Sequence, residues 1–301
     1  MIVLTGASGF IGSVVLRHLN RMGYTDVALV DDLPTPGQYK NLQGTQFSRL
    51  YTMDQAAKIS DQLHPQKGSI EAVVHLGACA DTTVHDWNYL CEMNVNFTRK
   101  WITFCNREKI PLIFASSAAV YGNGCAGPLN EYAFSKYVSE QEMPEASVVL
   151  RLFNVYGPGE GYKGRMASVI RHWIKQAESG TVNVFAGSEK FYRDFIYVED
   201  AARVITHFVN HFTPGTYDVG TGHAVQLSSL AEQIVEQTVP PELLTVVKTI
   251  EMPHDLKHQY QTYTCADVKQ LQSVKIDTTA FRDVEDGIRL YDFWLKQNLH
   301  Y

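Results

Sequence analysis

The most reactive pattern in this sequence is a tyrosine and a lysine four residues apart, Tyr132 and Lys136. On a helix this spacing puts both side chains on one face. A phenol is a poor base, with an ordinary pKa of about 10, but a nearby ammonium favours its ionised form. Ser116 and Ser117 end the apolar run 112–115, and a hydroxyl there could polarise a carbonyl or alcohol oxygen. We therefore predict a proton-transfer site with Ser117, Tyr132 and Lys136.

A glycine-rich turn lies at the start of the chain. Gly6, Gly9 and Gly12 follow the apolar run 2–4, and an amphipathic helical pattern begins near Phe10. Glycine allows the tight turn, and it lets a pyrophosphate approach the main chain closely. The N-terminus of the helix offers free N–H groups to phosphate. The pattern predicts a dinucleotide site that includes Gly6, Gly9, Phe10, Ile11 and Gly12.

Two adjacent aspartates, Asp31 and Asp32, follow the apolar run 27–30. They stand roughly 20 residues after the glycine turn, where a carboxylate of a dinucleotide-binding protein holds a ribose hydroxyl. Either residue could take that role, and two carboxylates should repel a 2′-phosphate. The residues therefore favour NAD, or the use of both cofactors, over a strict requirement for NADP.

Strand and helix patterns that could hold these residues alternate over the first half of the chain. The apolar runs 27–30, 72–76, 112–115 and 148–152 lack strict alternation, as strands buried on both faces do. Alternation of such strands with helices predicts an α/β fold with a parallel, doubly wound sheet. Ligands bind at the carboxyl edge of such a sheet, which is where the serines lie.

The pattern changes after Pro158. Residues 157–164 form a glycine-rich loop, and 166–177 has the periodicity of a helix. We expect the sheet to regain strands near 194–198 and 217–219. We therefore divide the chain into a dinucleotide-binding domain, 1–155 with segments near 194–222, and a lobe, 156–301, that mainly binds substrate.

Bulk properties exclude several classes of protein. A net charge of −6 and 45% apolar residues over 301 residues give no basic excess for nucleic acid. No apolar run approaches the ~20 residues of a membrane span, and the first strand leaves no room for a signal peptide. The five cysteines and 11 histidines show no metal-ligand spacing. We expect a cytoplasmic protein with free thiols, no metal and no membrane or nucleic-acid partner.

These motifs and several others match one group of enzymes. The matching stretches are 6–12, Asp31, 75–78, 115–122, Tyr132 with Lys136, 151–158, 193–200 and 217–222. Through them the chain resembles the extended short-chain dehydrogenase/reductases that modify nucleotide sugars. Stretches 159–168, 185–189 and 260–264 are similar to the ADP-glycero-manno-heptose 6-epimerases. The resemblance implies a Rossmann-like sheet with a smaller C-terminal substrate lobe, NADP as cofactor and a nucleotide-sugar substrate. We also expect a homo-oligomer.

The resemblance also implies a mechanism, epimerisation at C6″ of the heptose by transient oxidation. Tyr132 would be one base, Lys163 would be the other, and Arg193 would hold the diphosphate. The positions that would bind the cofactor, besides the glycine turn and the aspartates, are Gln38, His75, Leu76, Gly77, Ala78, Asn94, Lys136 and Val155. The positions that would contact the substrate are Ser117, Asn154, Arg165, His172, Phe185, Ser188, Arg193 and Tyr260.

Some features depart from the resembled family. A lysine that binds the 2′-phosphate in the family falls at Gln38, and Arg165 replaces a small hydroxyl residue expected near the substrate. The segment 122–132 is shorter, and Pro144 shortens the helix after Lys136. The expectation of a nucleotide-sugar epimerase is unaffected by these departures. They weaken the expectation of ADP-glycero-manno-heptose as substrate and of NADP as cofactor.

Other functions were weighed against this one. A sugar 4,6-dehydratase needs an acid and a base where this chain has Ala118 and Ala119, which can transfer no proton. The sequence is also compatible with a UDP-sugar 4-epimerase or a reductase of the same superfamily. A non-catalytic, cofactor-sensing protein is the alternative of another class, but such a protein would usually lack Tyr132 or Lys136, and both are present.

Overall fold

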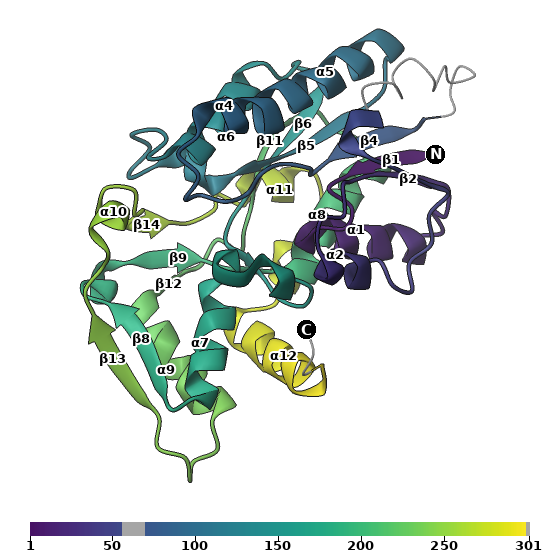
Figure 1. Ribbon diagram of the computed structural model, residues 1–301. Coiled ribbons are helices and arrows are strands. Elements are labelled where there is room, and N and C mark those ends of the chain that lie inside the picture. The colour runs from purple at the N-terminus through teal and green to yellow at the C-terminus, as the bar shows by residue number, and fades with distance from the viewer. Residues whose placement is uncertain (56–69, 299–301) are drawn as a thin grey trace.

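A parallel sheet forms the centre of the computed structural model, which describes residues 1–55 and 70–298 (Figure 1). Seven strands lie in the order β11-β6-β5-β4-β1-β2-β3. Every neighbouring pair is parallel. The strands are β1 (Ile2–Thr5), β2 (Val27–Val30), β3 (Arg49–Tyr51), β4 (Ala72–His75), β5 (Leu112–Ser117), β6 (Ser147–Leu152) and β11 (Gly215–Val219). The predicted α/β class is confirmed.

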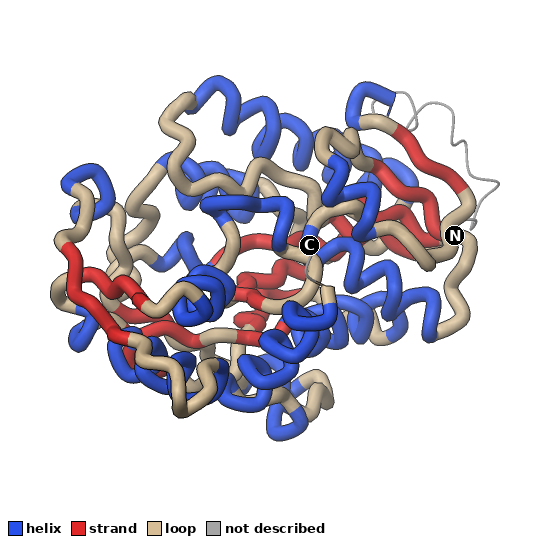
Figure 2. Tube along the Cα trace, turned by 60° about the horizontal axis from the view of Figure 1, so that its bottom comes forward, coloured by secondary structure: helices blue, strands red, loops and turns tan. Residues whose placement is uncertain are grey.

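Both faces of this sheet are covered by helices, as Figures 1 and 2 show. Alternate residues of β1 point to opposite faces: Ile2 and Leu4 pack with α1 and α8, whereas Val3 packs with α5. Because the strands are buried on both sides, their sequences are continuous apolar runs. The covering helices are α1 (Phe10–Arg21) and α8 (Val198–Asn210) on one face, and α5 (Phe97–Glu108) and α6 (Glu131–Gln141) on the other.

A second apolar core lies in the later half of the chain. Trp173, Ile174, Val182 and Ile234 are among its buried residues. It joins α7 (Val169–Glu178), β8 (Thr181–Phe185), α9 (Leu227–Thr238) and α12 (Val284–Gln297). β13 (Val246–Ile250) pairs with β8 at the edge of this group.

Two sequence predictions need correction. The segment 194–198 does not rejoin the large sheet, because β9 and β10 pair with other short strands between the two cores. The predicted helix 166–177 begins later, since Ser168 caps α7 by accepting a hydrogen bond from the Arg171 amide, and Gly161–Met166 forms a separate 3₁₀ turn. The strand predicted at 217–219 is present as β11. The short strands are β7 (Val155–Tyr156), β9 (Tyr192–Asp194), β10 (Ile196–Tyr197), β12 (Ala224–Gln226) and β14 (Tyr263–Thr264).

The remaining helices are short and lie between these elements. They are α2 (Pro36–Asn41), α4 (Trp87–Leu90), which continues through the π-helical turn Cys91–Asn96 into α5, α10 (His254–Lys257) and α11 (Lys269–Ser273). Within residues 1–55 and 70–298, no helix is long and apolar enough to cross a membrane. The five cysteines are free thiols, as predicted.

Candidate active site

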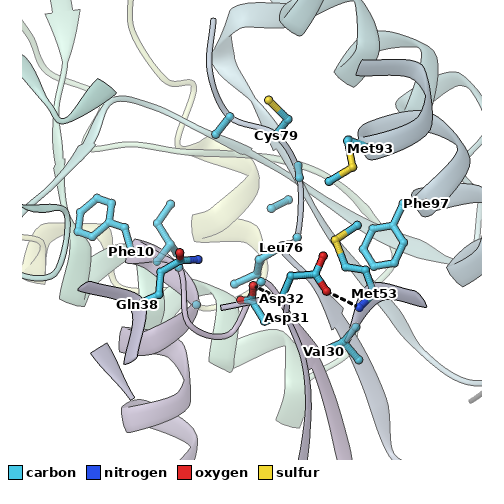
Figure 3. Close-up of a pocket in the computed structure, with 18 of the residues that line it drawn as sticks. Phe10, Val30, Asp31, Asp32, Gln38, Met53, Leu76, Cys79, Met93 and Phe97 are labelled. Carbon is cyan, nitrogen blue, oxygen red and sulfur yellow. Dashed lines mark hydrogen bonds between the residues drawn. The ribbon is translucent and has the colours of Figure 1, made fainter. Parts of the chain in front are cut away.

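Two adjoining cavities open at the carboxyl edge of the sheet. The first, of about 320 Å³, lies over the glycine turn and the ends of β1, β2 and β4 (Figure 3). The second, of about 400 Å³, lies between the end of β5 and the later half of the chain. Tyr132, Lys163 and Ser116 line both cavities. A group bound in either cavity can therefore reach the same tyrosine and lysine.

The glycine turn leaves no room for side chains. A Cβ atom on Gly12 would lie 2.0 Å from the carbonyl oxygen of Gly6, and one on Gly6 would lie 2.8 Å from the main chain of Gly77. Gly6 also has a φ of 65°, which L side chains rarely adopt. The turn thus brings the N-terminus of α1 to the floor of the first cavity. The residues predicted to bind the dinucleotide there all line this cavity: Gly6, Gly9, Phe10, Ile11 and Gly12.

The two aspartates reach the same cavity from the end of β2. The Asp31 carboxylate accepts a hydrogen bond of 2.8 Å from the Ser8 amide of the glycine turn. Asp32 accepts one of 2.8 Å from the amide of Met53, drawn in Figure 3. These bonds hold both carboxylates in place at the cavity, and like charges repel.

Gln38 also lines this cavity but is occupied with its own helix. Its side-chain carbonyl accepts from the main-chain amide of Thr35 at 3.2 Å, which is part of the capping box at the start of α2. Its amide donates to the hydroxyl of Ser8 at 3.2 Å. The residue therefore carries no charge toward the cavity and braces the glycine turn.

His75 lies behind the cavity rather than in it. It is buried, and its ring nitrogens lie 2.7 Å from Thr5 Oγ1 and 2.9 Å from Thr98 Oγ1. Thr5 Oγ1 in turn accepts from the Gly77 amide. Burial lowers the pKa of His75 to about 3, so the ring is neutral near pH 7. The following residues, Leu76, Gly77 and Ala78, line the cavity directly.

Asn94 is likewise buried behind the cavity. Its side chain makes hydrogen bonds of 2.8 and 3.0 Å to the amide and carbonyl of Cys79, which lines the cavity. It also donates to Ser135 on α6 at 2.8 Å. Asn94 thus joins the loop after β4 to the helix that carries Tyr132, and acts through Cys79.

The tyrosine and the lysine lie on one face of α6, as predicted. Lys136 donates to the Ala115 carbonyl at 2.9 Å, and burial lowers its pKa to about 8. Burial raises the pKa of Tyr132, and a hydrogen bond with Ser117 partly offsets this. We expected the ammonium to favour the phenolate, but in the structure burial of the phenol is the largest influence on the pKa of Tyr132.

The two serines at the end of β5 have different partners. Ser116 donates to Glu140 at 2.5 Å, and Glu140 forms a bidentate ion pair with Arg151 of β6. Ser117 faces Tyr132. Ser117 therefore lies beside Tyr132 at the second cavity, and its catalytic role stays a prediction.

The second cavity collects several of the predicted substrate contacts. Asn154, Arg193 and Tyr260 line it together with Lys163. Val155, which was predicted to bind the cofactor, lines this second cavity and not the first. The Arg193 guanidinium lies 5.0 Å from the centre of the Tyr260 ring and donates to the Tyr192 and Gln261 carbonyls. It is buried, and within residues 1–55 and 70–298 it forms no ion pair with Asp194 or with Glu199, which pairs with His18 and Arg21.

Neither cavity is lined by four of the other predicted substrate contacts, Arg165, His172, Phe185 and Ser188, whereas Ser117 lines the second. Arg165 is exposed and reaches across to Thr83 at 2.9 Å and Asp81 at 3.5 Å. His172 lies 3.2 Å from the Arg165 carbonyl. Phe185 packs edge-on against Tyr260, and Ser188 is buried nearby. Phe185 contacts one of the cavity-lining residues, whereas Arg165 faces the rim.

Sequence reasoning missed Tyr162. Its hydroxyl accepts a 3.0 Å hydrogen bond from the Phe10 amide, at the N-terminus of α1, and its side chain lines the first cavity. Its position beside Lys163 was the available signal, but 152 residues separate it from Phe10, and only the fold brings them together.

The first cavity fits a dinucleotide. At its floor the glycine turn exposes main chain that side chains at the glycine positions would cover. The N-terminus of α1 and the Asp31 carboxylate at the end of β2 lie beside this turn. No cluster of His, Cys, Asp or Glu among residues 1–55 and 70–298 could hold a metal ion. Fold and site together define a dinucleotide-binding protein of the doubly wound class.

Comparison with known proteins gives the family. The model of the NAD dependent epimerase/dehydratase family matches residues 2–220, and the chain belongs to this family. An enzyme, expected from Tyr132 and Lys136, is thus confirmed over a cofactor-sensing binding protein.

Several solved structures share the fold. UDP-glucose 4-epimerase from Thermotoga maritima is 21% identical with a TM-score of 0.84, and the match covers 99% of each chain. UDP-N-acetylglucosamine 4-epimerase from Methanobrevibacter ruminantium is 23% identical with a TM-score of 0.83, over 99% of this chain and 98% of that one. ADP-L-glycero-D-manno-heptose-6-epimerase from Helicobacter pylori is 24% identical with a TM-score of 0.80, over 100% and 96%.

Proposed function

We propose that this protein epimerises a nucleotide-diphosphate sugar, and that its substrate is ADP-glycero-manno-heptose, inverted at C6″. The observation that carries the proposal is the position of Tyr132 and Lys163, which line both cavities from different elements. Inversion requires loss of a proton from the C6″ hydroxyl as hydride leaves the carbon, and return of a proton to the ketone oxygen after the ketone has turned over. Tyr132 and Lys163 are the side chains that would transfer these protons from the two sides.

The bound dinucleotide would supply one thing, the acceptance and return of a hydride. The glycine turn and Asp31 would hold it, and Lys136 would bind the ribose near Tyr132. Tyr132 would move the proton of the sugar hydroxyl with Ser117 as its hydrogen-bonding partner. Burial lowers the pKa of Lys163, which favours its service as a base near neutral pH.

Arg193 supports a diphosphate-bearing substrate. It lies in the wall of the second cavity, buried against Tyr260, and a guanidinium binds phosphate oxygens in bidentate fashion. Asn154 and Tyr260 would contact the rest of the substrate. Dehydration has no matching acid and base, because Ala118 and Ala119 follow Ser117 at the second cavity.

For the cofactor we propose NAD in preference to NADP. Asp31 and Asp32 are fixed at the ribose end of the cavity, and Gln38 stands where the resembled family has a lysine for the 2′-phosphate. Dissociation constants for both cofactors test this, with Asp31→Asn as the variant. A wild-type protein that binds NADP far more tightly than NAD would contradict the electrostatic argument.

The test of the reaction is incubation of the NAD-loaded protein with ADP-D-glycero-D-manno-heptose. We expect NMR to show inversion at C6″ with no net formation of reduced nicotinamide, measured by its near-ultraviolet absorbance. Inversion at C4″ of UDP-glucose or UDP-glucuronate instead would assign the chain to the UDP-sugar 4-epimerases. Net reduction or oxidation of a sugar would assign it to the reductases.

A further inference from the structure

The hydroxyl of Tyr162 lies at the glycine turn, against a main-chain amide at the N-terminus of α1. This hydroxyl is 3.0 Å from the Phe10 amide nitrogen. A Cβ built on Gly9 would lie 3.4 Å from that same hydroxyl. The missing side chain of Gly9 is what lets a pyrophosphate approach the main chain, so the phenol stands in the space that the glycine leaves open.

The contact is built into the packing of the surrounding elements. A Cβ on Gly37 of α2 would lie 2.4 Å from Cβ of Tyr162, so the ring needs a glycine beside it. Asn41, also in α2, donates at 3.1 Å to the carbonyls of both Ser8 and Gly159. The glycine turn, α2 and the segment that leads into Tyr162 are thus fastened together around the phenol.

We propose that Tyr162 sets the affinity for the cofactor, because its hydroxyl competes with the cofactor pyrophosphate for the Phe10 amide. One N–H group makes one strong hydrogen bond, so the phenol must leave before a phosphate oxygen can accept. A hydrogen bond to a charged oxygen is roughly twice as strong as one to a neutral oxygen. The pyrophosphate therefore displaces the Tyr162 hydroxyl, and the affinity for the cofactor is lowered by the free energy of the lost Phe10–Tyr162 hydrogen bond.

The same exchange reaches the substrate side of the site. Lys163 follows Tyr162 in the 3₁₀ turn Gly161–Met166, and its ammonium lies 5.6 Å from the centre of the Phe10 ring. A shift of this turn that takes the phenol off the amide would carry the adjoining ammonium with it. This part of the inference rests on the proposed role of Lys163 as the second base.

Binding of ADP-ribose and of adenosine, measured by calorimetry, tests the competition. ADP-ribose contains the pyrophosphate and adenosine does not. Tyr162→Phe keeps the ring and removes the hydroxyl, so ADP-ribose should bind about three- to tenfold more tightly, as expected for one neutral hydrogen bond. Adenosine should bind as it does to the wild type.

Tyr24→Phe is the matched control, because it also removes one hydroxyl hydrogen bond, to Asn210 at 2.7 Å, away from the site. The Tyr24→Phe variant should bind ADP-ribose and adenosine with the same dissociation constants as the wild type. Tyr162→Leu gives a second variant should the phenylalanine fail to fold, and the ratio of the two dissociation constants is the readout for each protein. An unchanged or weaker binding of ADP-ribose by folded Tyr162 variants would overturn the inference.

Neither ligand requires turnover, so the outcome is separate from the reaction. Tighter ADP-ribose binding by Tyr162→Phe in a protein that epimerises none of the sugars would support the competition and refute the proposed function. Failure of the wild type and of Tyr162→Phe to bind ADP-ribose would overturn the competition and the cofactor proposal together.

Discussion

At the scale of single residues, Tyr132 and Lys163 carry the proposed chemistry. Tyr132→Phe removes a proton-transfer group but keeps the packing of the ring, so turnover should fall by about 10²–10⁴ while NAD binding stays the same. Lys163→Ala should be similarly severe, and the double variant hardly worse, because residues that act as a unit are not additive. Single-turnover rates and NAD titrations check this. A Tyr132→Phe enzyme within a few-fold of wild type would remove the tyrosine from the mechanism.

Burial of the Lys136 ammonium destabilises the folded protein, and this effect on the free energy of unfolding should depend on pH. The Lys136 pKa of about 8 in the folded protein lies below the ordinary 10.5 because the side chain is buried. Below about pH 8 the unfolded chain holds this proton more tightly, so the lysine destabilises the fold, and the penalty disappears as the pH rises toward 10.5.

Lys136→Met should therefore unfold with a free energy on the order of 2 kcal/mol above wild type at neutral pH. The difference should shrink in urea titrations at higher pH. The exposed Lys175→Met is the control and should show no such trend. A constant difference across this range would mean that the ammonium is not strained by burial.

At the scale of elements, His75 connects β1, β4 and α5 through Thr5 and Thr98. Its pKa of about 3 lies below the ordinary 6.5 because the ring is buried. As the pH falls below about 6.5, His75 is protonated in the unfolded chain but stays neutral in the folded protein. The free energy of unfolding therefore falls by about 1.4 kcal/mol per pH unit, down to the pKa of the folded protein.

His75→Gln retains a hydrogen-bonding side chain but does not titrate. Its free energy of unfolding, measured in urea from neutral to acidic pH, should fall less steeply than that of the wild type. His254→Gln replaces an exposed histidine and should follow the wild type. Equal slopes for wild type and His75→Gln would show that the ring is protonated in the folded protein.

At the scale of the whole molecule, the two cavities meet but are lined by different parts of the chain. Arg193 contributes only to the second. Arg193→Met should raise KM for the nucleotide sugar by about tenfold or more, the loss of a charge-assisted hydrogen bond, and leave NAD binding unchanged. Arg193→Lys should recover part of the loss. Weaker NAD binding by a folded Arg193→Met protein would show that the cavities are not independent.

The sequence by itself determined the parallel sheet, the glycine turn, the aspartates after β2, and the pairing of Tyr132 with Lys136. Each depends on spacing within one element or one turn, and local geometry is regular. Only the tertiary structure decided that His75 and Asn94 lie behind the cavity, that β9 and β10 stay out of the large sheet, and that Arg165 faces the rim. It also brought Tyr162 to the Phe10 amide. These outcomes depend on how separate elements pack together, over separations of up to 152 residues between Tyr162 and Phe10, and no local pattern records that.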